Sequence, residues 1–409
     1  MLPLPLPDGS GPAGADATPG DGRGPSARRV AVLLPYPFPG PFDYVVPEGV
    51  VVEPGDVVLV PLHRREVMGV VWERGGEAGP PPRARLRALI AVVDVPPMRA
   101  TLRRFLARMA EYVLAPPGEV MAMALRAAGP EPVPTATGWV AAAGTVDGRV
   151  TAARGRVLAV LADGTARAGA ELARAAGVGP GVIRGLAASG LILPAALPPE
   201  RQFAAPDPAH PGAALSPIQA AHAEALAGKV AAGAFSVTLL DGVTGSGKTE
   251  VYLEAIAAAL RAGRQALVLL PEIALSSQWL ERFHGRFGVA PAVWHSDLSS
   301  RTRRITWRAV AAGGAPVVVG ARSALFLPFT DLGLVVVDEE HETAFKQEEG
   351  VVYHARDMAV VRARLCTAPA ELVSATPSLE TIANVEAGRY QRISLPTRHG
   401  GAVLPQVAA

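Results

Sequence analysis

The sequence has little of several features that would place it in other protein classes. Its single cysteine, Cys366, excludes an internal disulfide and a cysteine-rich zinc site, and we expect it to be a buried, inert thiol. Aromatic residues make up only 5% of the 409 residues, and the formal net charge of +2 is too small to indicate nucleic-acid binding by itself. No stretch approaches the roughly 20 apolar residues that cross a bilayer. We therefore expect no membrane partner and a cytoplasmic location.

Glycine and proline are plentiful, at 43 and 39 residues, and much of the excess lies in residues 1–28. This segment has few large apolar groups to bury and predicts a disordered tail. It also lacks the uninterrupted apolar core of a signal peptide. Residues 29–130 are richer in β-branched residues. Short alternating runs at 57–60 and 67–72 predict strands of a small β-rich domain, and helical spacing of apolar residues follows over 98–114.

Residues 131–147 are polar and rich in proline and glycine, which predicts a linker. Residues 150–195 then show a helix, turn, helix, turn, helix pattern that ends in a short strand. This order is typical of a winged-helix domain, although plain helical packing gives the same pattern in an alanine-rich chain. A second linker is expected over 196–214.

Residues 215–395 alternate between strand and helix signals. The buried strands are predicted from "VTLLDG", "ALVLLP", "VVVGA", "LVVVDEE" and "AELVSAT", each a short apolar run with helical text between. This alternation indicates a parallel sheet with crossover helices, which is an α/β fold.

One loop in this region predicts nucleotide binding. The text "GVTGSGKT" at 242–249 fits the phosphate-binding pattern G-x-x-x-x-G-K-[ST], between a predicted strand and a predicted helix over 249–261. Glycines allow backbone N–H groups to point at phosphates, a lysine can reach the β- and γ-phosphates, and a threonine hydroxyl can bind Mg²⁺. The residues expected to bind ATP here are Gly242, Thr244, Gly245, Ser246, Gly247, Lys248 and Thr249.

An acidic pair follows the strand "LVVVD". Asp338 is expected to hold Mg²⁺, directly or through water, and Glu339 to polarise the attacking water. Acidic residues after a strand are often only a solvated loop, so this prediction depends on the phosphate loop. Together they indicate a nucleoside triphosphate with Mg²⁺, a combination that kinases, GTPases, transporter ATPases and motor enzymes share.

The residues of two motifs indicate which of these nucleotide-binding classes the chain resembles. "DEEH" (338–341) and "SATPS" (374–378) resemble the superfamily-2 helicases, in which the second motif couples nucleotide state to the nucleic-acid groove through small hydroxyls such as those of Ser374 and Thr376. Gln219 resembles the helicase glutamine that pairs with the adenine edge. By itself, a glutamine in a helix is more often a solvent-facing residue.

Longer stretches resemble one family, the PriA-type replication-restart helicases of bacteria. The resemblance runs through nearly all of 215–398, in "DGVTGSGKTEVYL", "LVLLPEIALSSQ", "WHSDLSSRTRRITW", "GARSALF", "FKQEEGVVYHARD" and "SATPSLETIANVEAGRY". At the N-terminus, "PFDYVVPEG" and "GDVVLVPL" resemble the family's small β domain, which binds the 3′ end of a nascent DNA strand. The resemblance implies a RecA-like first lobe and an ATP-dependent 3′→5′ DNA helicase that recognises stalled or abandoned forks.

The resemblance also implies DNA contacts. "PFDY" places Phe42 and Asp43 at the 3′-end pocket, where the carboxylate would accept a hydrogen bond from the terminal 3′-OH. The other implied DNA-binding residues are Arg87, Arg322, Ser323, Phe345 and Tyr353. The alternative for Tyr353 is that it packs its loop against the lobe. Two departures stand out: His63 replaces a common glycine, and Val351 replaces a common tryptophan.

The implied partners are DNA (forks, 3′ ends and single strands), other primosome proteins and single-strand-binding protein. Full-length members of the family also contain a zinc module, a second lobe with the arginine that completes ATP hydrolysis, and a C-terminal domain. The sequence shows no cysteine-rich zinc ligands and no segment that resembles the second lobe or the C-terminal domain. We therefore expect a truncated form with weak ATP binding and little hydrolysis or unwinding. The alternatives are a non-catalytic fragment that binds ATP and DNA ends, and an unrelated phosphate-loop enzyme such as a kinase.

Overall fold

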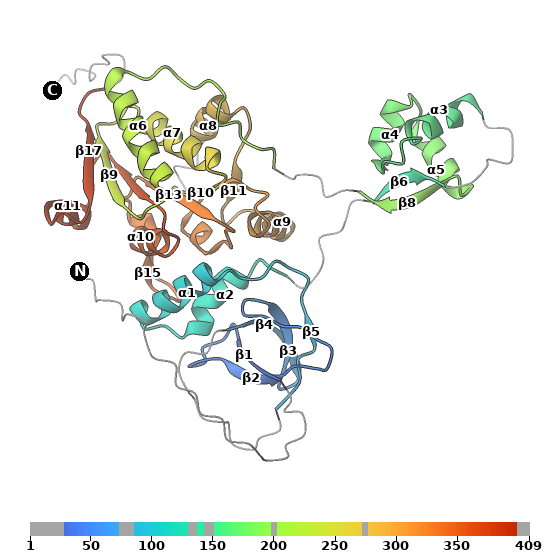
Figure 1. Cartoon of the computed structure of the whole chain (residues 1–409), viewed down its shortest axis with the longest axis horizontal. Helices are drawn as coiled ribbons and strands as arrows, with labels where there is room; N and C mark the ends of the chain where they lie inside the picture. Colours follow the sequence, from blue (N-terminus) through green and yellow to red (C-terminus); the bar gives the residue numbers. More distant parts are fainter. Residues whose placement is uncertain are drawn as a thin grey trace, which may run out of the picture.

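The computed structural model describes residues 28–72, 86–129, 137–142, 151–197, 203–271 and 277–398. Except for Arg28, the tail predicted over 1–28 lies outside the described residues. Three units follow one another along the chain: an N-terminal domain (28–129), a middle domain (137–197) and an α/β domain (203–398) (Figure 1). None of the helices in these ranges is long and apolar enough to span a membrane.

The N-terminal domain is built on an antiparallel sheet with the strand order β2-β1-β4-β3-β5. The strands are β1 (Arg29–Leu33), β2 (Phe42–Val45), β3 (Val57–Leu62), β4 (Arg65–Val71) and β5 (Ala91–Val92). The two strands predicted from alternation are confirmed as β3 and β4. They form a hairpin with a two-residue turn, and the first residue of this turn, His63, has a φ of +53°. Glycine adopts this left-handed conformation without strain, which gives a physical reason for the glycine expected there.

Two helices complete the domain: α1 (Ala100–Val113) and α2 (Pro117–Leu125). Leu114 ends α1 in the left-handed conformation, and Pro117 occupies the first turn of α2, where it disrupts no helical hydrogen bond. The buried face of α1 includes Leu102, Phe105 and Met109. The helix expected over 98–114 is thereby confirmed.

The middle domain combines three helices with a small antiparallel sheet of strand order β7-β6-β8. Its elements are β6 (Thr137–Ala141), α3 (Ala152–Val160), β7 (Arg167–Ala168), α4 (Gly169–Ala175), α5 (Pro180–Ala188) and β8 (Ile192–Ala196). The three predicted helices and the final strand are present, but the linker predicted over 131–147 was wrong at β6. This strand pairs with β8 along its full length, and its Trp139 packs against the core of the domain. The name winged helix stays a prediction.

The α/β domain is a seven-stranded parallel sheet in the order β11-β12-β10-β13-β16-β9-β17. The strands are β9 (Val237–Gly242), β10 (Gln265–Leu269), β11 (Ala292–Trp294), β12 (Val317–Gly320), β13 (Leu332–Asp338), β16 (Ala370–Ser374) and β17 (Gln391–Leu395). All five predicted strands are confirmed. The sequence missed the two edge strands, because β11 has only three residues and β17 is mostly exposed.

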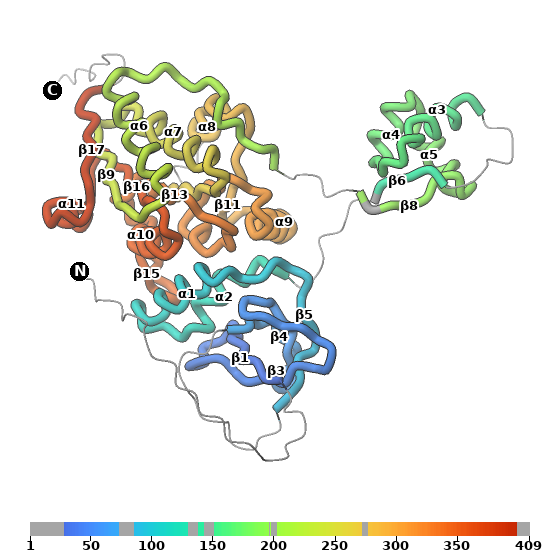
Figure 2. Tube along the Cα trace, in the orientation of Figure 1, coloured from blue at the N-terminus to red at the C-terminus, as the bar shows by residue number. Residues whose placement is uncertain are grey.

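Helices cover both faces of this sheet (Figure 2). One face packs against α6 (Pro217–Ala232), α7 (Lys248–Arg261) and α8 (Ser277–Phe287), and the other against α9 (Ser300–Ala311) and α10 (Ala355–Leu365). A last helix, α11 (Leu379–Glu386), precedes β17. Cys366, which follows α10, is half-buried rather than fully buried, and desolvation raises the pKa of its thiol. The thiol therefore stays protonated at neutral pH, as expected for an inert residue.

The N-terminal domain packs directly against the α/β domain. Helices α1 and α2 lie beside α10 and the short 3₁₀ helix η2 (Arg322–Phe326), and buried residues of both domains form one continuous core (Figure 1). The indole Nε1 of Trp307 on α9 donates to the carbonyl of Ala124 on α2 at 2.8 Å.

Candidate functional site

The strand order brings the predicted nucleotide motifs to one edge of the sheet. Strand β16 lies between β9 and β13. The phosphate loop follows β9, "DEEH" follows β13 and "SATPS" follows β16. Because the three strands are parallel, their carboxyl ends lie together, which is where ligands bind in open α/β sheets.

The loop over 242–249 has the backbone of a phosphate cradle. Gly245 and Gly247 both have φ of +82°, a conformation that strains residues with a side chain. A Cβ atom added to Gly247 would lie 2.2 Å from Nε2 of Gln219. Lys248 opens α7 and is buried, and its Nζ donates to the carbonyl oxygen of Gly242 at 2.7 Å. Desolvation lowers the pKa of this amine, while the charges of Glu339 and Asp338 act against that shift.

Gln219 lies against this loop, with an exposed fraction of 3%. Its amide oxygen accepts from the backbone N–H of Ser216 at 2.8 Å, which closes a capping box at the start of α6. Its Nε2 donates to the carbonyl of Ser246 at 2.8 Å. The glutamine therefore holds the phosphate loop rather than facing solvent. Its pairing with an adenine edge stays a prediction.

Asp338 ends β13 beside Lys248. One carboxylate oxygen accepts from the Tyr252 hydroxyl at 2.8 Å, and the other from the backbone N–H of Glu339 at 3.0 Å. Trp279 in turn donates to the Tyr252 oxygen at 2.6 Å. Burial raises the pKa of Asp338 to about 6, against the opposing effect of the Tyr252 hydrogen bond. Tyr252 was not among the predicted site residues, although its position one helical turn after Lys248 places both side chains on the same face of α7.

Glu339, next in the chain, has a φ of +52°, and its carboxyl group lies beside His341, with 3.7 Å between Oε2 and Nδ1. His341 Nδ1 also lies 2.8 Å from the hydroxyl of Ser374, which accepts from the backbone N–H of Thr376 at 3.0 Å. Thus the "DEEH" and "SATPS" motifs contact each other directly. Ser374 is fully buried and Thr376 is exposed, so only one of the two predicted coupling hydroxyls takes part in this contact.

Glu340, the third residue of "DEEH", is completely buried and is the centre of a polar network that the sequence analysis missed. Its carboxylate accepts from Nη1 of Arg356 at 3.1 Å, from both the N–H and the hydroxyl of Ser378, and from the hydroxyl of Thr381. Arg356 also donates to Ser378 at 2.6 Å. This network could not be recognised from the sequence, because the partners of Glu340 lie 16 to 41 residues away from it in the chain.

The residues of this edge fit a nucleotide with Mg²⁺. The buried hydroxyl of Ser246 has no hydrogen-bond partner among the described residues, and the Asp338 carboxylate lies beside Lys248 and the first turn of α7. Thr249, in that turn, also interacts with the Tyr252 hydroxyl that binds Asp338. Across the described ranges, no cluster of three or more His, Cys, Asp or Glu residues could hold a metal ion on its own. Thr249 and Asp338 are the side chains at this edge that would hold Mg²⁺.

The predicted 3′-end residues Phe42, Asp43 and Arg87 all belong to the N-terminal domain. Phe42 is 38% exposed and contacts Phe38 edge-to-face, with ring centroids 4.9 Å apart. Asp43 is half-buried on β2, opposite Ala31. Nη1 of Arg87 donates to the carbonyl of His63 at 2.7 Å. Arg87 borders a cavity of about 680 Å³, whereas Phe42 and Asp43 are not part of its lining. The lining residues are Tyr36, Phe38, Leu62, His63, Arg64, Arg65, Val67 and Arg87.

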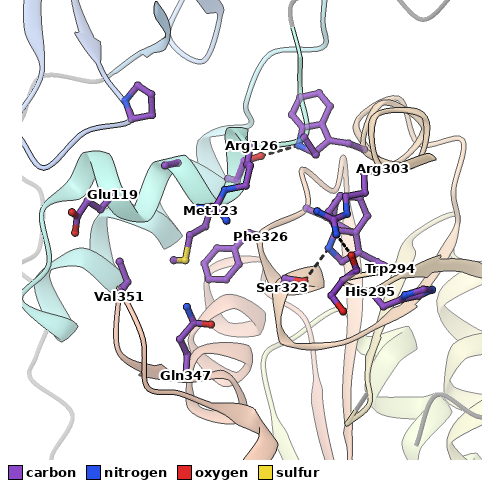
Figure 3. A pocket seen from close by; sticks show the side chains of 18 of the residues that line it. Glu119, Met123, Arg126, Trp294, His295, Arg303, Ser323, Phe326, Gln347 and Val351 are labelled. Atoms are coloured by element: carbon purple, nitrogen blue, oxygen red, sulfur yellow. Dashed lines mark hydrogen bonds between the residues drawn. The ribbon is translucent and has the colours of Figure 1, made fainter. Parts of the chain in front are cut away.

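A second cavity, of about 800 Å³, lies between the N-terminal and α/β domains (Figure 3). Ser323 faces it and accepts from Nε1 of Trp294 at 3.2 Å. Arg303 and Arg126 add positive charge to its lining. Arg322 adjoins Ser323, and its guanidinium donates to the carbonyls of Ala344 and Lys346 and thereby fixes the "FKQEEG" loop.

Two predicted base-stacking residues have a different place in the structure. Phe345 and Tyr353 are 1% and 5% exposed, and Tyr353 packs edge-to-face on Phe326. In this conformation neither ring is available to stack on a base, and the alternative, in which Tyr353 packs the loop against the lobe, describes what is observed. Val351 is also buried. Most of the "PEIALSSQ" segment lies outside the described residues.

Comparisons with known proteins agree with this architecture. Residues 31–126 match the 3′DNA-binding domain of PriA, and residues 216–385 match the DEAD/DEAH box helicase family. The replication restart protein PriA of Rickettsia conorii is 49% identical over 170 residues, which is 42% of this chain and 26% of that protein. PriA of Bacillus subtilis is 48% identical over 172 residues, which is 42% of this chain and 21% of that protein.

The aligned region thus spans about a quarter of the length of these relatives. Among solved structures, RecG bound to a three-way DNA junction covers 47% of this chain and 25% of its own, with 21% identity and a TM-score of 0.36. The two family matches, in the order of the two domains described above, confirm that this chain is similar to the PriA-type replication-restart helicases, with a PriA 3′DNA-binding domain region followed by a DEAD/DEAH box helicase region.

Proposed function

We propose that this chain is the ATP-binding and DNA-end-binding part of a replication-restart helicase. The observation that carries the proposal is the meeting of Lys248, Asp338 and Ser374 at the carboxyl ends of β9, β13 and β16, in a domain that packs against a second domain similar to the PriA 3′DNA-binding domain. The cytoplasmic location and the roles of primosome proteins and single-strand-binding protein stay predictions.

In the proposed mechanism, the backbone of 242–249 and Lys248 bind the β- and γ-phosphates, as in other phosphate-loop proteins. Thr249 and Asp338 would hold Mg²⁺, which supplies charge neutralisation on the phosphates. Glu339 is the side chain that would polarise water, because it follows Asp338 at the sheet edge and its carboxyl group is partly exposed. The His341–Ser374 contact would pass changes at Glu339 to the "SATPS" motif.

On the DNA side, Asp43 would accept a hydrogen bond from a terminal 3′-OH, with Phe42 beside it for the last base and Arg87 for a phosphate. Ser323 and Arg322 would contact the single strand from the α/β domain. The specificity for a hydroxyl end comes from charge, since a 3′-phosphate would place a second anion against the Asp43 carboxylate.

Two measurements test the proposal. The first compares binding of DNA with a 3′-OH and a 3′-phosphate end to the wild type, Asp43→Ala and Glu48→Ala, which removes a neighbouring carboxylate and is the control. A preference for 3′-OH that only Asp43→Ala removes supports the end site, and equal binding of both ends contradicts it.

The second measurement is ATP turnover with and without single-stranded DNA in the wild type and Glu339→Gln. DNA-stimulated turnover that the substitution removes supports a helicase motor. Bound ATP with the same negligible turnover in both proteins favours the alternative, a fragment that binds ATP and DNA ends without catalysis. No ATP binding in the wild type would contradict both functions.

A further inference from the structure

Helix α10 connects the two sites. At its first turn, Arg356 is 5% exposed and contacts Glu340 of "DEEH" and Ser378 of "SATPS". Towards its other end, Arg362 is 2% exposed and lies at the contact with the N-terminal domain. The two residues are six positions apart, about 9 Å along a helix axis.

Arg362 binds both domains at once. Its guanidinium carbon is 5.3 Å from the ring centroid of Phe105 on α1 and 5.4 Å from that of Phe329 in the α/β domain. Its Nη2 donates to the carbonyl of Leu327 at 2.5 Å, and its Nη1 donates to the carbonyl of Leu325. A planar guanidinium can stack on two rings and donate from its edge at the same time, which an ammonium cannot do.

The carbonyls that Arg362 binds belong to the segment that carries Arg322 and Ser323. Leu325 lies within η2, and Phe326 of the same helix contacts Phe105, with ring centroids 6.0 Å apart. Phe326 also packs on Tyr353, which lies two residues before the start of α10. The first turn of α10 thus contacts the "DEEH" and "SATPS" motifs. Its later part, through Arg362, holds the segment that carries Arg322 and Ser323 against the N-terminal domain.

We propose that α10 couples the N-terminal DNA-end domain to the nucleotide site, with Arg362 as the positioning residue. This inference rests on the proposed function. A DNA end bound to the N-terminal domain changes the orientation of α1 against Arg362, and α10 passes that change to Arg356, Glu340 and Ser378. Coupling of this kind is reciprocal, so the end and ATP each change the affinity for the other by the same factor.

The experiment is the affinity for Mg·ATP, measured with and without a short single strand that ends in 3′-OH, for the full chain. In the wild type the DNA is expected to change the affinity by about fivefold or more. Arg362→Met and Arg362→Lys are expected to bring this factor to below about twofold, while ATP alone and DNA alone bind as in the wild type. A residue with only a structural role would weaken the separate affinities or the fold instead.

Arg364→Met is the matched control. It lies on the same helix and also stacks over a phenylalanine, Phe235, but it is exposed and both partners belong to the α/β domain. This variant is expected to keep the wild-type coupling. Phe105→Leu removes one ring on the far side of the contact, and it gives a second test should the Arg362 variants fail to fold.

The possible outcomes distinguish a failure of the coupling through α10 from a failure of the proposed function. Coupling that is lost in the Arg362 and Phe105 variants but kept in Arg364→Met supports the proposal. Coupling that is kept in Arg362→Met overturns the proposal and leaves the proposed function intact. If the Arg362 variants do not fold, coupling that is kept in a folded Phe105→Leu has the same meaning. A wild type that binds ATP and the 3′ end without any coupling also overturns it. A wild type that binds neither ligand overturns the proposed function itself, and this inference with it.

Discussion

Replacing Glu371 with glutamine is expected to stabilise the protein at neutral pH. Glu371 lies in β16, the inner strand that carries Ser374, and it is 1% exposed. Neither of its carboxyl oxygens has a hydrogen-bond partner among the described residues. Burial raises its pKa from 4.5 to about 8, although the charge of Lys229 on α6 acts in the opposite direction. The side chain is therefore protonated in the folded protein at pH 7.

The sign of the pH dependence follows from this shift. Because the folded protein holds the proton more tightly than the unfolded chain, the free energy of unfolding falls as the pH rises from 4.5 to about 8. At pH 7 the cost is about 3.5 kcal/mol, which is about 1.4 kcal/mol for each of roughly 2.5 pH units, and at pH 5 it is below about 1 kcal/mol. Glutamine is neutral at both values and carries no such cost.

Urea unfolding followed by tryptophan fluorescence at pH 5 and pH 7 measures the difference. The gain in unfolding free energy from Glu371→Gln should be larger at pH 7 than at pH 5 by about 2.5 kcal/mol. Any cost of the unpaired amide is the same at both pH values and cancels. Glu224→Gln, the same change at an exposed position of α6, should show no such difference. An equal gain at both pH values would refute the reasoning, because the buried carboxyl would then titrate normally.

Three further predictions concern the nucleotide edge. Mg²⁺-dependent ATP affinity should fall as the pH drops through about 6, where the Asp338 carboxylate becomes protonated. In Tyr252→Phe the fall should begin at a higher pH, because the hydrogen bond that lowers the pKa of Asp338 is lost. An affinity that does not change with pH would contradict the first prediction, and a wild-type pH profile in Tyr252→Phe would contradict the second. Gly247→Ala should lose ATP binding, since its φ is +82° and the new Cβ would meet Gln219 at 2.2 Å, whereas Gly263→Ala, also at positive φ but in open space, should keep it. Glu340→Gln should lower the unfolding free energy by about 1.5 to 3 kcal/mol, measured by urea titration, because Arg356 loses its buried carboxylate partner and keeps only Asp357 and Glu380, which are more exposed.

Local patterns allowed most of the α/β domain to be predicted. The five central strands are continuous apolar runs, and the phosphate loop needs glycine, lysine and threonine at fixed spacing, so both are encoded within short stretches. Strand β6 was missed because its pairing with β8 depends on residues more than 50 positions away. Edge strand β17 is mostly exposed and gives no apolar run.

The tertiary contacts could not be predicted for the same reason. Tyr252 binds Asp338 across 86 residues, and Arg362 stacks on Phe105 from another domain. The family resemblance of "FKQEEGVVYHARD" implied that Tyr353 and Phe345 stack on DNA. The structure buries both, since Phe326 and the N-terminal domain supply an apolar surface that the loop sequence does not show.

The proposed function requires that the loop over 242–249 binds a nucleoside triphosphate through Lys248. Isothermal titration of Mg·ATP into the wild type, Lys248→Ala and Arg261→Ala tests it most directly. Arg261 lies at the far end of the same helix and is exposed, so this variant is the matched control. Hydrogen bonds to charged groups are worth about 1.5 to 3 kcal/mol, so Lys248→Ala should weaken ATP binding by at least about tenfold, while Arg261→Ala leaves it unchanged. Equal affinities in all three proteins would contradict the account.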